Sequence, residues 1–590
     1  MVNLVDYRFF RLAVAVVALT GIAVPYAQEP SAGLRAADAD YREGVRALNR
    51  GDLAAARRLF AEVVRLAPAA EQGHSALGAV LVRQGQVPEG IRELQKALTI
   101  KPTDQSAEEN LALAYLETGL AAKALPYFAK LDAGARAGNR QLAPTLLEAW
   151  ARAEAASGET GPALGHLQAA VAQQPDNPVW RDELGSLYGT RQEWPEAERE
   201  FSAAIRIKPE YAVAHFHLGS VLEAERKDGA REELAEAARL APNDAMMALA
   251  VGRTLAGAAD DAGALPLLEK AHRLSPDSLA ADYELGIVKQ RAGQLEKAVA
   301  LLQPVVAAQP GNSDALINLG MAYTQMQQAK SAIPLLQHAI AMKPGNAMAH
   351  QDLAAAYIQL NQVEDAVTEL KAALKLSPDS PQLHYNLGLA YKMEDDAQSA
   401  IPELETAARQ DENAYEPRYV LGLLYMQVAR YAEAAAQLER SLKLHPDNGE
   451  GWATLGSVYN KMDRPADAVT ALREAVKQLP NQSDPHLTLA AVLAKQNEPA
   501  EAAAERKIAA GLMRDHMNEQ RAEVATNSGK SMLAAGKLED AITEFRNAVG
   551  FDPGYAQAHE GLADALDRLG KSAEAQAERD QAQALRRKAN

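Results

Sequence analysis

Small and apolar residues recur along this chain in a regular pattern, and each period of the pattern places them on two short helical faces. One face carries positions 4, 7, 8 and 11 of the period, and the other carries positions 20, 24 and 27, which is the spacing of buried residues on amphipathic helices. A proline follows at position 32 in most periods, where it cannot continue the second helix. The pattern therefore predicts a helix–turn–helix unit. The period that ends at Pro480 shows it through Leu455, Gly456, Tyr459, Ala468, Leu472 and Ala475.

The unit repeats every 34 residues over almost the whole chain. The spacing is carried by Pro68, Pro102, Pro175, Pro209, Pro242, Pro276, Pro310, Pro344, Pro378, Pro446, Pro480 and Pro553. A fixed period of this size is the signature of a solenoid. In this register, 16 repeats run from about residue 37 to the C-terminus.

Two positions in each unit are restricted to small residues. Position 8 is Gly or Ala in every repeat, and position 20 is Ala in all but one, where it is Gly90. Residues this small let the two helix axes approach closely, while Tyr or Leu at position 11 and Phe or Leu at position 24 fill the space around them. Gly, Asp, Asn or Gln near positions 15 and 16 form the turn, as in Gly51-Asp52.

This pattern resembles the tetratricopeptide repeat (TPR) family. A unit such as Trp452-Ala-Thr-Leu-Gly-Ser-Val-Tyr459 followed by Ala468, Leu472, Ala475 and Pro480 carries the resemblance, and such units cover everything after the N-terminal segment. The resemblance implies an all-α fold, a TPR α-solenoid wound as a right-handed superhelix. It also implies a concave groove lined by the first helix of each repeat.

The phase of the repeat slips at two insertions of five residues. The first falls around residues 132–140, a small-residue stretch that suits a loop, and the second around residues 513–525, a polar stretch that could prolong a helix. We expect these slips to divide the array into blocks at 37–136, 137–513 and 514–590. The polar segment 573–590 is expected to be a terminal helix that caps the stack.

The N-terminus has the features of a secretory signal peptide over residues 1–27, followed by a linker over 28–36. Arg8 and Arg11 precede an apolar run of 13 residues, Leu12 to Val24, and Ala27 offers a cleavage site. The run is short for a membrane span, which needs about 20 apolar residues. We expect a periplasmic or secreted protein, with an uncleaved N-terminal membrane anchor as the alternative and no membrane span in the mature chain.

Composition and motifs argue against several function classes. The net charge of −17, without a basic block, disfavours nucleic acid, and the absence of cysteine excludes disulfides and Cys-ligated metals. Gly529-Lys530-Ser531 lacks the rest of a phosphate-binding loop. His215 and His217 point to different helix faces, and the other histidines look scattered, many of them on repeat surfaces. We expect no catalytic, cofactor or metal site, and no enzyme activity.

The best candidate for a binding surface is the first-helix face of repeats 8 to 12. Positions 5, 6 and 9 place an apolar and aromatic stripe beside a polar one there, which suits an extended peptide or a partner helix. Packing against the adjacent repeat is the alternative role of these side chains. The candidate residues are Tyr283, Glu284, Ile287, Ile317, Asn318, Met321, Asp352, Tyr385, Asn386, Leu389, Tyr419 and Leu423.

The sequence is most consistent with a non-enzymatic protein–protein interaction scaffold outside the cytoplasm. Its partners would be other proteins, bound through peptide or helix segments in the concave groove. One alternative is an accessory subunit of a glycosyltransferase or polysaccharide-export assembly that acts in trans. A second alternative is a structural solenoid that associates with itself.

Overall fold

The computed structural model describes residues 32–589. The predicted signal peptide lies outside this range. The predicted linker at 28–36 is described only from Ala32, and residues 32–36 already belong to the first helix. No helix of the described part is both long and apolar enough to cross a membrane. Two compact units make up the chain, Met1–Ala308 and Gln309–Asn590.

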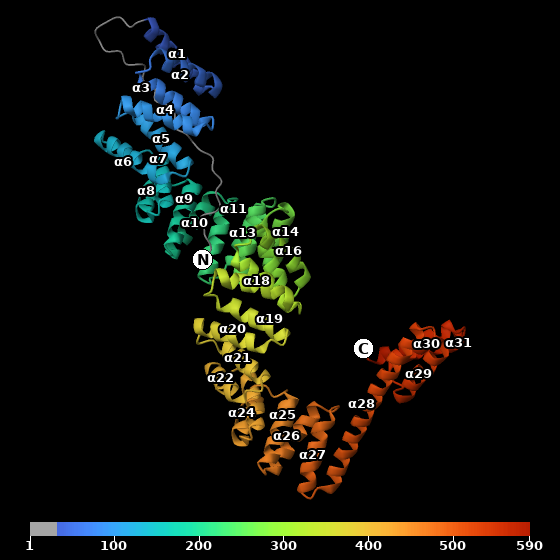
Figure 1. Cartoon of the computed structure of the whole chain (residues 1–590). Coiled ribbons are helices and arrows are strands. Elements are labelled where there is room, and N and C mark those ends of the chain that lie inside the picture. The colour runs from blue at the N-terminus through green and yellow to red at the C-terminus, as the bar shows by residue number, and fades with distance from the viewer. Residues whose placement is uncertain (1–31, 590) are drawn as a thin grey trace. The chain divides into compact units, whose positions relative to one another are not determined.

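The described part of the first unit consists of successive helices (Figure 1). Their bounds are α1 Ala32–Asn49, α2 Leu53–Leu66, α3 Glu71–Arg83, α4 Val87–Ile100, α5 Gln105–Glu117, α6 Ala121–Ala137, α7 Pro144–Ala156, α8 Thr160–Gln173, α9 Pro178–Thr190, α10 Trp194–Ile207, α11 Ala212–Ala224, α12 Ala230–Leu240, α13 Ala245–Gly257, α14 Asp261–Leu274, α15 Leu279–Arg291 and α16 Leu295–Ala308.

The second unit continues the same alternation. Its helices are α17 Ser313–Gln325, α18 Ala329–Met342, α19 Ala347–Gln359, α20 Val363–Leu376, α21 Pro381–Met393, α22 Ala397–Gln410, α23 Glu416–Gln427, α24 Tyr431–Leu444, α25 Gly449–Lys461, α26 Pro465–Gln478, α27 Ser483–Lys495, α28 Pro499–Ala534, α29 Leu538–Phe551, α30 Ala556–Arg568 and α31 Ser572–Ala589. The all-α class is confirmed, because residues 32–589 form helices and no strand.

Close helix contact inside each repeat depends on the small residue at position 8. A Cβ placed on Gly422 would lie 2.5 Å from Cγ of Leu438, and one on Gly78 would lie 2.7 Å from Cγ of Leu94. These distances are well inside van der Waals contact, so in these two repeats the leucine at position 24 occupies the space that a methyl group at position 8 would need. Leu438 and Leu94 are themselves fully buried.

The turn within every repeat contains a residue in the left-handed backbone region at position 15, and the turn after α11 contains a second one, Gly229. This recurrence fixes the count of 16 repeats independently of the prolines. Seven of these residues are glycine and nine are not: Gly51, Gly85, Gly119, Gly158, Gln192, Arg226, Ala259, Gly293, Gln327, Asn361, Asp395, Ala429, Asp463, Asn497, Gly536 and Gly570. The non-glycine residues are held at a conformation that disfavours a Cβ.

Histidines at position 4 join successive repeats, and here the sequence interpretation was wrong. Position 4 was expected to be apolar, and the histidines looked scattered. In the structure the ring of His559 lies 2.6 Å from a carboxylate oxygen of Glu578 and 3.1 Å from the carbonyl oxygen of Pro553. Each such imidazole thus connects the end of one repeat to the next. The same arrangement recurs at His74, His215, His350, His384 and His486.

Position 11 forms a second link between repeats. The hydroxyl of Tyr459 donates to Glu439 at 2.6 Å, and the amide of Gln168 donates to the hydroxyl of Tyr188 at 2.7 Å. In both pairs the partner sits twenty residues earlier, at position 25 of the preceding repeat. A tyrosine at position 11 therefore fills the space between helices and also holds the neighbouring repeat through its polar end.

The two insertions both lengthen helices. The first was expected to form a loop around residues 132–140. Instead α6 continues to Ala137, and residues 138–143 form the connection to α7, with Asn139 at φ 53°. Alanine-rich sequence favours this extension. The second insertion joins two helices into α28, which has 36 residues. Sixteen helix pairs therefore appear as 31 helices. The division into three blocks stays a prediction.

Candidate peptide-binding surface

The predicted binding residues occupy the first helices of five consecutive repeats. Eleven of the twelve are half-buried, and Ile317 is buried at 5% exposure. A half-buried side chain contacts its neighbours and still offers surface to a partner, so most of the set lies between the two roles that the sequence left open. In the first unit, α15 carries Tyr283, Glu284 and Ile287; in the second, α17, α19, α21 and α23 carry Ile317, Asn318, Met321, Asp352, Tyr385, Asn386, Leu389, Tyr419 and Leu423.

Two of the predicted residues, Tyr385 and Tyr419, line one cavity of about 360 Å³ in the second unit. Tyr415 and His445 add two further rings, and the carboxylates there belong to Glu416, Asp447 and Glu450. The remaining lining residues are Val420, Asn448, Gly449 and Leu479. The cavity therefore combines aromatic surface with negative charge. We call it the tyrosine cavity.

Local structure holds the residues of the tyrosine cavity in place. Tyr415 precedes α23 directly, and its ring stacks on His445 with centroids 4.4 Å apart and planes at 19°. The hydroxyl of Ser441 donates to the carbonyl oxygen of Tyr415 at 3.1 Å. Asn448 caps α25 by accepting from the amide of Gly451 at 2.9 Å. These contacts limit the conformational entropy that the aromatic residues would lose on binding a ligand.

The carboxylates lie close enough to the tyrosines to affect their ionisation. Burial raises the pKa of Tyr385, and the nearby Glu416 raises it further. Burial and then Glu450 raise the pKa of Tyr419, while a hydrogen bond to Thr454 acts in the opposite direction. Both phenols therefore stay neutral at physiological pH and present hydroxyl groups rather than additional negative charges.

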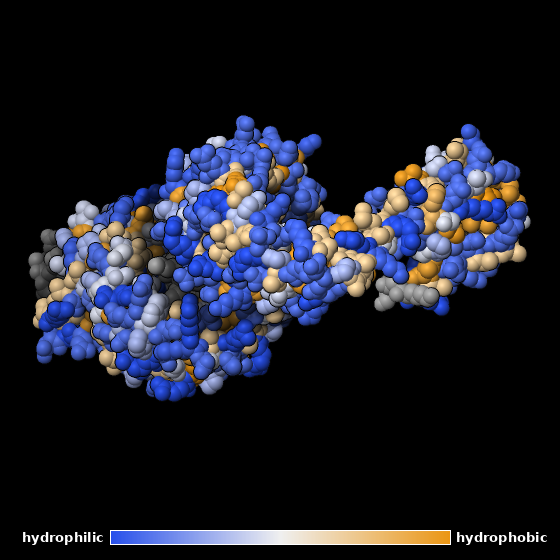
Figure 2. All heavy atoms as spheres, turned by 90° about the horizontal axis from the view of Figure 1, so that it is seen from below, coloured by the Kyte–Doolittle hydropathy of each residue, from blue (hydrophilic) through white to orange (hydrophobic). Residues whose placement is uncertain are grey.

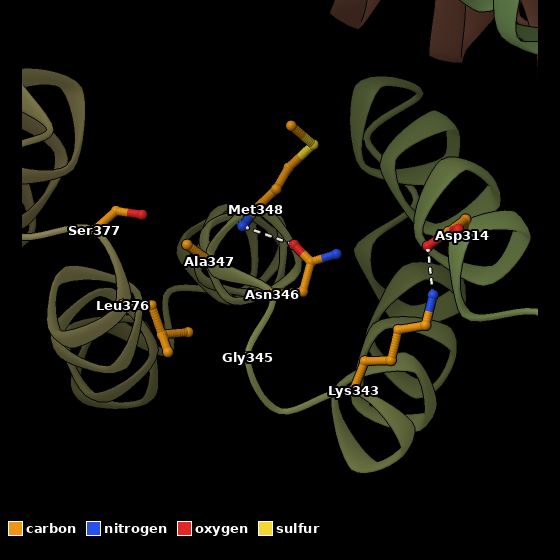
Figure 3. Close-up of a pocket in the computed structure, with 8 residues that line it drawn as sticks. All are labelled: Asp314, Lys343, Gly345, Asn346, Ala347, Met348, Leu376 and Ser377. Atoms are coloured by element: carbon orange, nitrogen blue, oxygen red, sulfur yellow. Dashed lines mark hydrogen bonds and ion pairs between the residues drawn. The ribbon is translucent and has the colours of Figure 1, made fainter. Parts of the chain in front are cut away.

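A second cavity of about 550 Å³ opens at the matching place three repeats earlier (Figure 3). Its charged groups already satisfy each other, because Nζ of Lys343 lies 3.1 Å from a carboxylate oxygen of Asp314. Asn346 caps α19 there, as Asn448 caps α25. None of its lining residues is aromatic: Asp314, Lys343, Gly345, Asn346, Ala347, Met348, Leu376 and Ser377. We call it the methionine cavity.

Other predicted residues use their polar groups inside the array. The amide of Asn318 donates to the carbonyl oxygen of Asp314 at 2.9 Å, and Asn386 accepts from Gln382 at 2.9 Å, so both serve their own helix. Burial raises the pKa of Asp352 to about 7, and one of its carboxylate oxygens is buried without a hydrogen-bond partner. Burial also raises the pKa of Glu284.

The sequence motifs that resemble chemical sites have structural roles. A Cβ on Gly529 would lie 2.8 Å from Phe545, so this glycine serves helix packing. His215 pairs with Glu233, and His217 lies 2.8 Å from Asp182. Across residues 32–589 no three His, Cys, Asp or Glu side chains are grouped to hold a metal ion. Most of the face drawn in Figure 2 is hydrophilic, with smaller apolar areas between.

Sequence reasoning missed Tyr415, His445 and the three carboxylates of the tyrosine cavity. Tyr415 precedes Tyr419 by four residues, which is the spacing of neighbours on one helical face, so this signal was available. His445 sits at position 31 of its repeat, in the connection after the second helix. Its contribution depends on how two repeats meet, which the pattern within one repeat does not reveal.

Sequence models of the tetratricopeptide repeat match most of the chain. The matched ranges are 45–183, 183–245, 255–319, 289–333, 354–394, 419–483, 454–511 and 526–588. The chain belongs to the tetratricopeptide repeat family. This confirms the resemblance inferred from the prolines and small residues. TPR arrays generally serve as scaffolds for interactions between proteins. No curated protein matches this TPR chain in sequence.

Several solved structures are similar to parts or most of the chain. The Cut9–Hcn1 hetero-tetramer structure matches at 15% identity and a TM-score of 0.36, covering 90% of this chain and 96% of that one. A MamA structure has 20% identity and a TM-score of 0.27, with coverage of 27% and 94%. YrrB, described as a TPR protein with an unusual peptide-binding site, has 22% identity and a TM-score of 0.28, with coverage of 31% and 95%.

Proposed function

We propose that this TPR protein is a non-enzymatic scaffold outside the cytoplasm that holds extended or helical segments of partner proteins along the first-helix face of its second unit. The tyrosine cavity is the main point of attachment. The observation that carries the proposal is that Tyr385 and Tyr419, predicted as binding residues, line one cavity and remain half-buried. Aromatic residues of this kind supply much of the binding energy at protein interfaces.

The extracytoplasmic part of the proposal rests on the sequence of residues 1–27. Positive charge followed by a short apolar run and a small-residue site favours export. A fusion of residues 1–40 to a reporter that is active only after export tests this part separately. Export of the fusion is expected, and a reporter retained in the cytoplasm would contradict the assignment without affecting the binding proposal.

The binding proposal is tested with the double variant Tyr385→Ala, Tyr419→Ala. We expect it to lose capture of partners in pull-downs from the native envelope with cross-linking mass spectrometry, while its helicity and Tm stay near wild type. The matched control is Tyr357→Ala, Tyr391→Ala. These two tyrosines are also half-buried, but they lie at position 11 and outside the cavity. The control should retain capture even though Tyr357 loses its bond from Gln337.

Two results would overturn the binding proposal. If the cavity variant captures the same partners as wild type, the cavity is not the point of attachment. If the cavity variant loses its helicity or unfolds at a much lower temperature, the tyrosines serve packing instead.

A further inference from the structure

We propose that the tyrosine cavity binds the guanidinium group of an arginine carried by the partner segment. This inference rests on the proposed function and specifies the chemistry of the partner at that site. It follows from three features of the cavity, namely its carboxylates, its rings and a repeated arrangement elsewhere in the same chain.

The first feature is negative charge without a partner. Glu416, Asp447 and Glu450 line the cavity and are exposed, and none of them forms an ion pair with a residue of the described chain. Many other carboxylates of the second unit do form such pairs, as Asp314 does with Lys343 in the methionine cavity. Three unpaired carboxylates around one cavity favour a cationic ligand.

The second feature is aromatic surface that no cation of the described chain covers. Tyr385, Tyr415 and Tyr419 line the cavity. His445 stacks on one face of Tyr415, and no lysine or arginine between residues 32 and 589 lies over any of the three rings. A tyrosine ring attracts a cation through its negative face. The cavity therefore offers two independent sources of affinity for one positive group.

The third feature is that this chain already combines arginine, tyrosine and carboxylate in the same way. The guanidinium of Arg430 lies 4.5 Å from the ring centroid of Tyr425, and its Nε donates to Glu433 at 3.0 Å. The tyrosine cavity has the ring and the carboxylate of this arrangement without the cation.

The arrangement recurs one repeat later, and in both cases the guanidinium lies closer to the ring than the lysines that cover other tyrosines of this chain. Arg464 lies 4.5 Å from the ring of Tyr459 and donates from Nε to Asp467 at 2.7 Å. A planar guanidinium can stack on a ring and donate sideways to a carboxylate simultaneously, which a compact ammonium cannot do as well. The net charge of −17 supports the approach of a basic segment.

The test selects ligands without assuming a partner. A displayed library of random 12-residue peptides is panned against the full chain, and bound peptides are eluted and remade with a fluorescent label. Each peptide is titrated against wild type, against Tyr385→Ala with Tyr419→Ala, and against Glu416→Gln with Glu450→Gln. In parallel, each arginine of the peptide is replaced by citrulline, which keeps the shape and removes the charge.

The control for the charge variant is Asp314→Asn with Asp484→Asn. All four acidic residues stand at position 2 of their repeats, in the first turn of a helix, so both double variants remove the same kind of helix-terminal charge. Only Glu416 and Glu450 line the tyrosine cavity. A difference between the two variants therefore reports the cavity rather than the helix ends.

We expect the selected peptides to contain arginine and to bind about tenfold more weakly to the charge variant or after citrulline replacement, and less than about twofold more weakly to the control. Peptides that need the two tyrosines but lack a cation, or that prefer lysine to arginine, would overturn the arginine inference and leave the proposed function standing. If no selected peptide depends on Tyr385 and Tyr419, the proposed function fails and the inference fails with it.

Discussion

Replacing Asp352 by asparagine should stabilise the protein at pH 8 and have little effect at acidic pH. Asp352 is half-buried on α19, and one of its carboxylate oxygens lies buried without a hydrogen-bond partner. Burial raises its pKa from 3.8 to about 7. The charged form is therefore disfavoured in the folded state, and asparagine has nearly the same shape without the charge.

The sign and size of the effect follow from proton linkage. Below pH 3.8 the carboxyl is neutral in both the folded and unfolded states, so Asp352 has no electrostatic cost. Between the two pKa values the unfolded state gains more from ionisation, and the free energy of unfolding falls as pH rises. The full shift corresponds to about 4 kcal/mol, which partial contact with water reduces to about 1–2 kcal/mol.

The assay is urea unfolding of wild type and Asp352→Asn at pH 4 and pH 8. At pH 8 the variant should gain about 1–2 kcal/mol, and at pH 4 about a third of that. Because solenoids unfold in segments, hydrogen exchange of peptides covering residues 346–360 should show the same gain locally. Asp379→Asn, at an exposed turn residue, is the control. An equal gain at both pH values, or no gain at pH 8, would refute the reasoning.

Three further predictions concern the repeats themselves. Ala429→Gly should raise the free energy of unfolding by about 0.5 kcal/mol, because Ala429 has a φ of 58° that disfavours a Cβ. A lower urea midpoint would show that the turn tolerates a Cβ. His350→Ala should cost about 1–3 kcal/mol in urea unfolding, because it leaves Glu369 and the Pro344 carbonyl without their bonds, and an unchanged midpoint would contradict the linking role. Gly422→Ala should cost about 1–3 kcal/mol and speed proteolysis within α23 and α24, and unchanged stability would show that Leu438 does not depend on the glycine.

The fold could be predicted from the sequence because the same residue types recur at the same positions of each repeat. Small residues at position 8, turn residues at 15 and prolines at 32 each have a local physical reason, and their agreement over 16 repeats removes ambiguity. The structure confirms this through the left-handed residue at every position 15 and through contacts such as that between Gly422 and Leu438.

The links between repeats were harder to predict. His350 and its equivalents bond to residues six positions before and about nineteen after them, so the relevant neighbours lie outside any single helical face. The loop expected around residues 132–140 is only partly present, because α6 includes residues 132–137. Its small residues suit a turn, yet alanines also favour the helix, and Ala135 near the end of α6 is buried in the core.

The candidate binding surface could be predicted only in part. Helical periodicity identified Tyr385 and Tyr419, which line the tyrosine cavity. It could not find His445, which comes from the connection between repeats. It also could not separate Asn318 and Asn386, whose amides bond within their own helices, from side chains that remain open to a partner.

Site-specific photo-cross-linking in the native cell tests the central claim most directly. A photoreactive phenylalanine derivative in place of Tyr419 preserves an aromatic ring in the tyrosine cavity, and the same group at Met393 is the control. Met393 is 50% exposed at the end of α21 and does not line the cavity. A scaffold that binds its partners at the tyrosine cavity should give a specific cross-linked protein from position 419 and none from position 393. Cross-links at both positions alike, or at neither, would contradict the account.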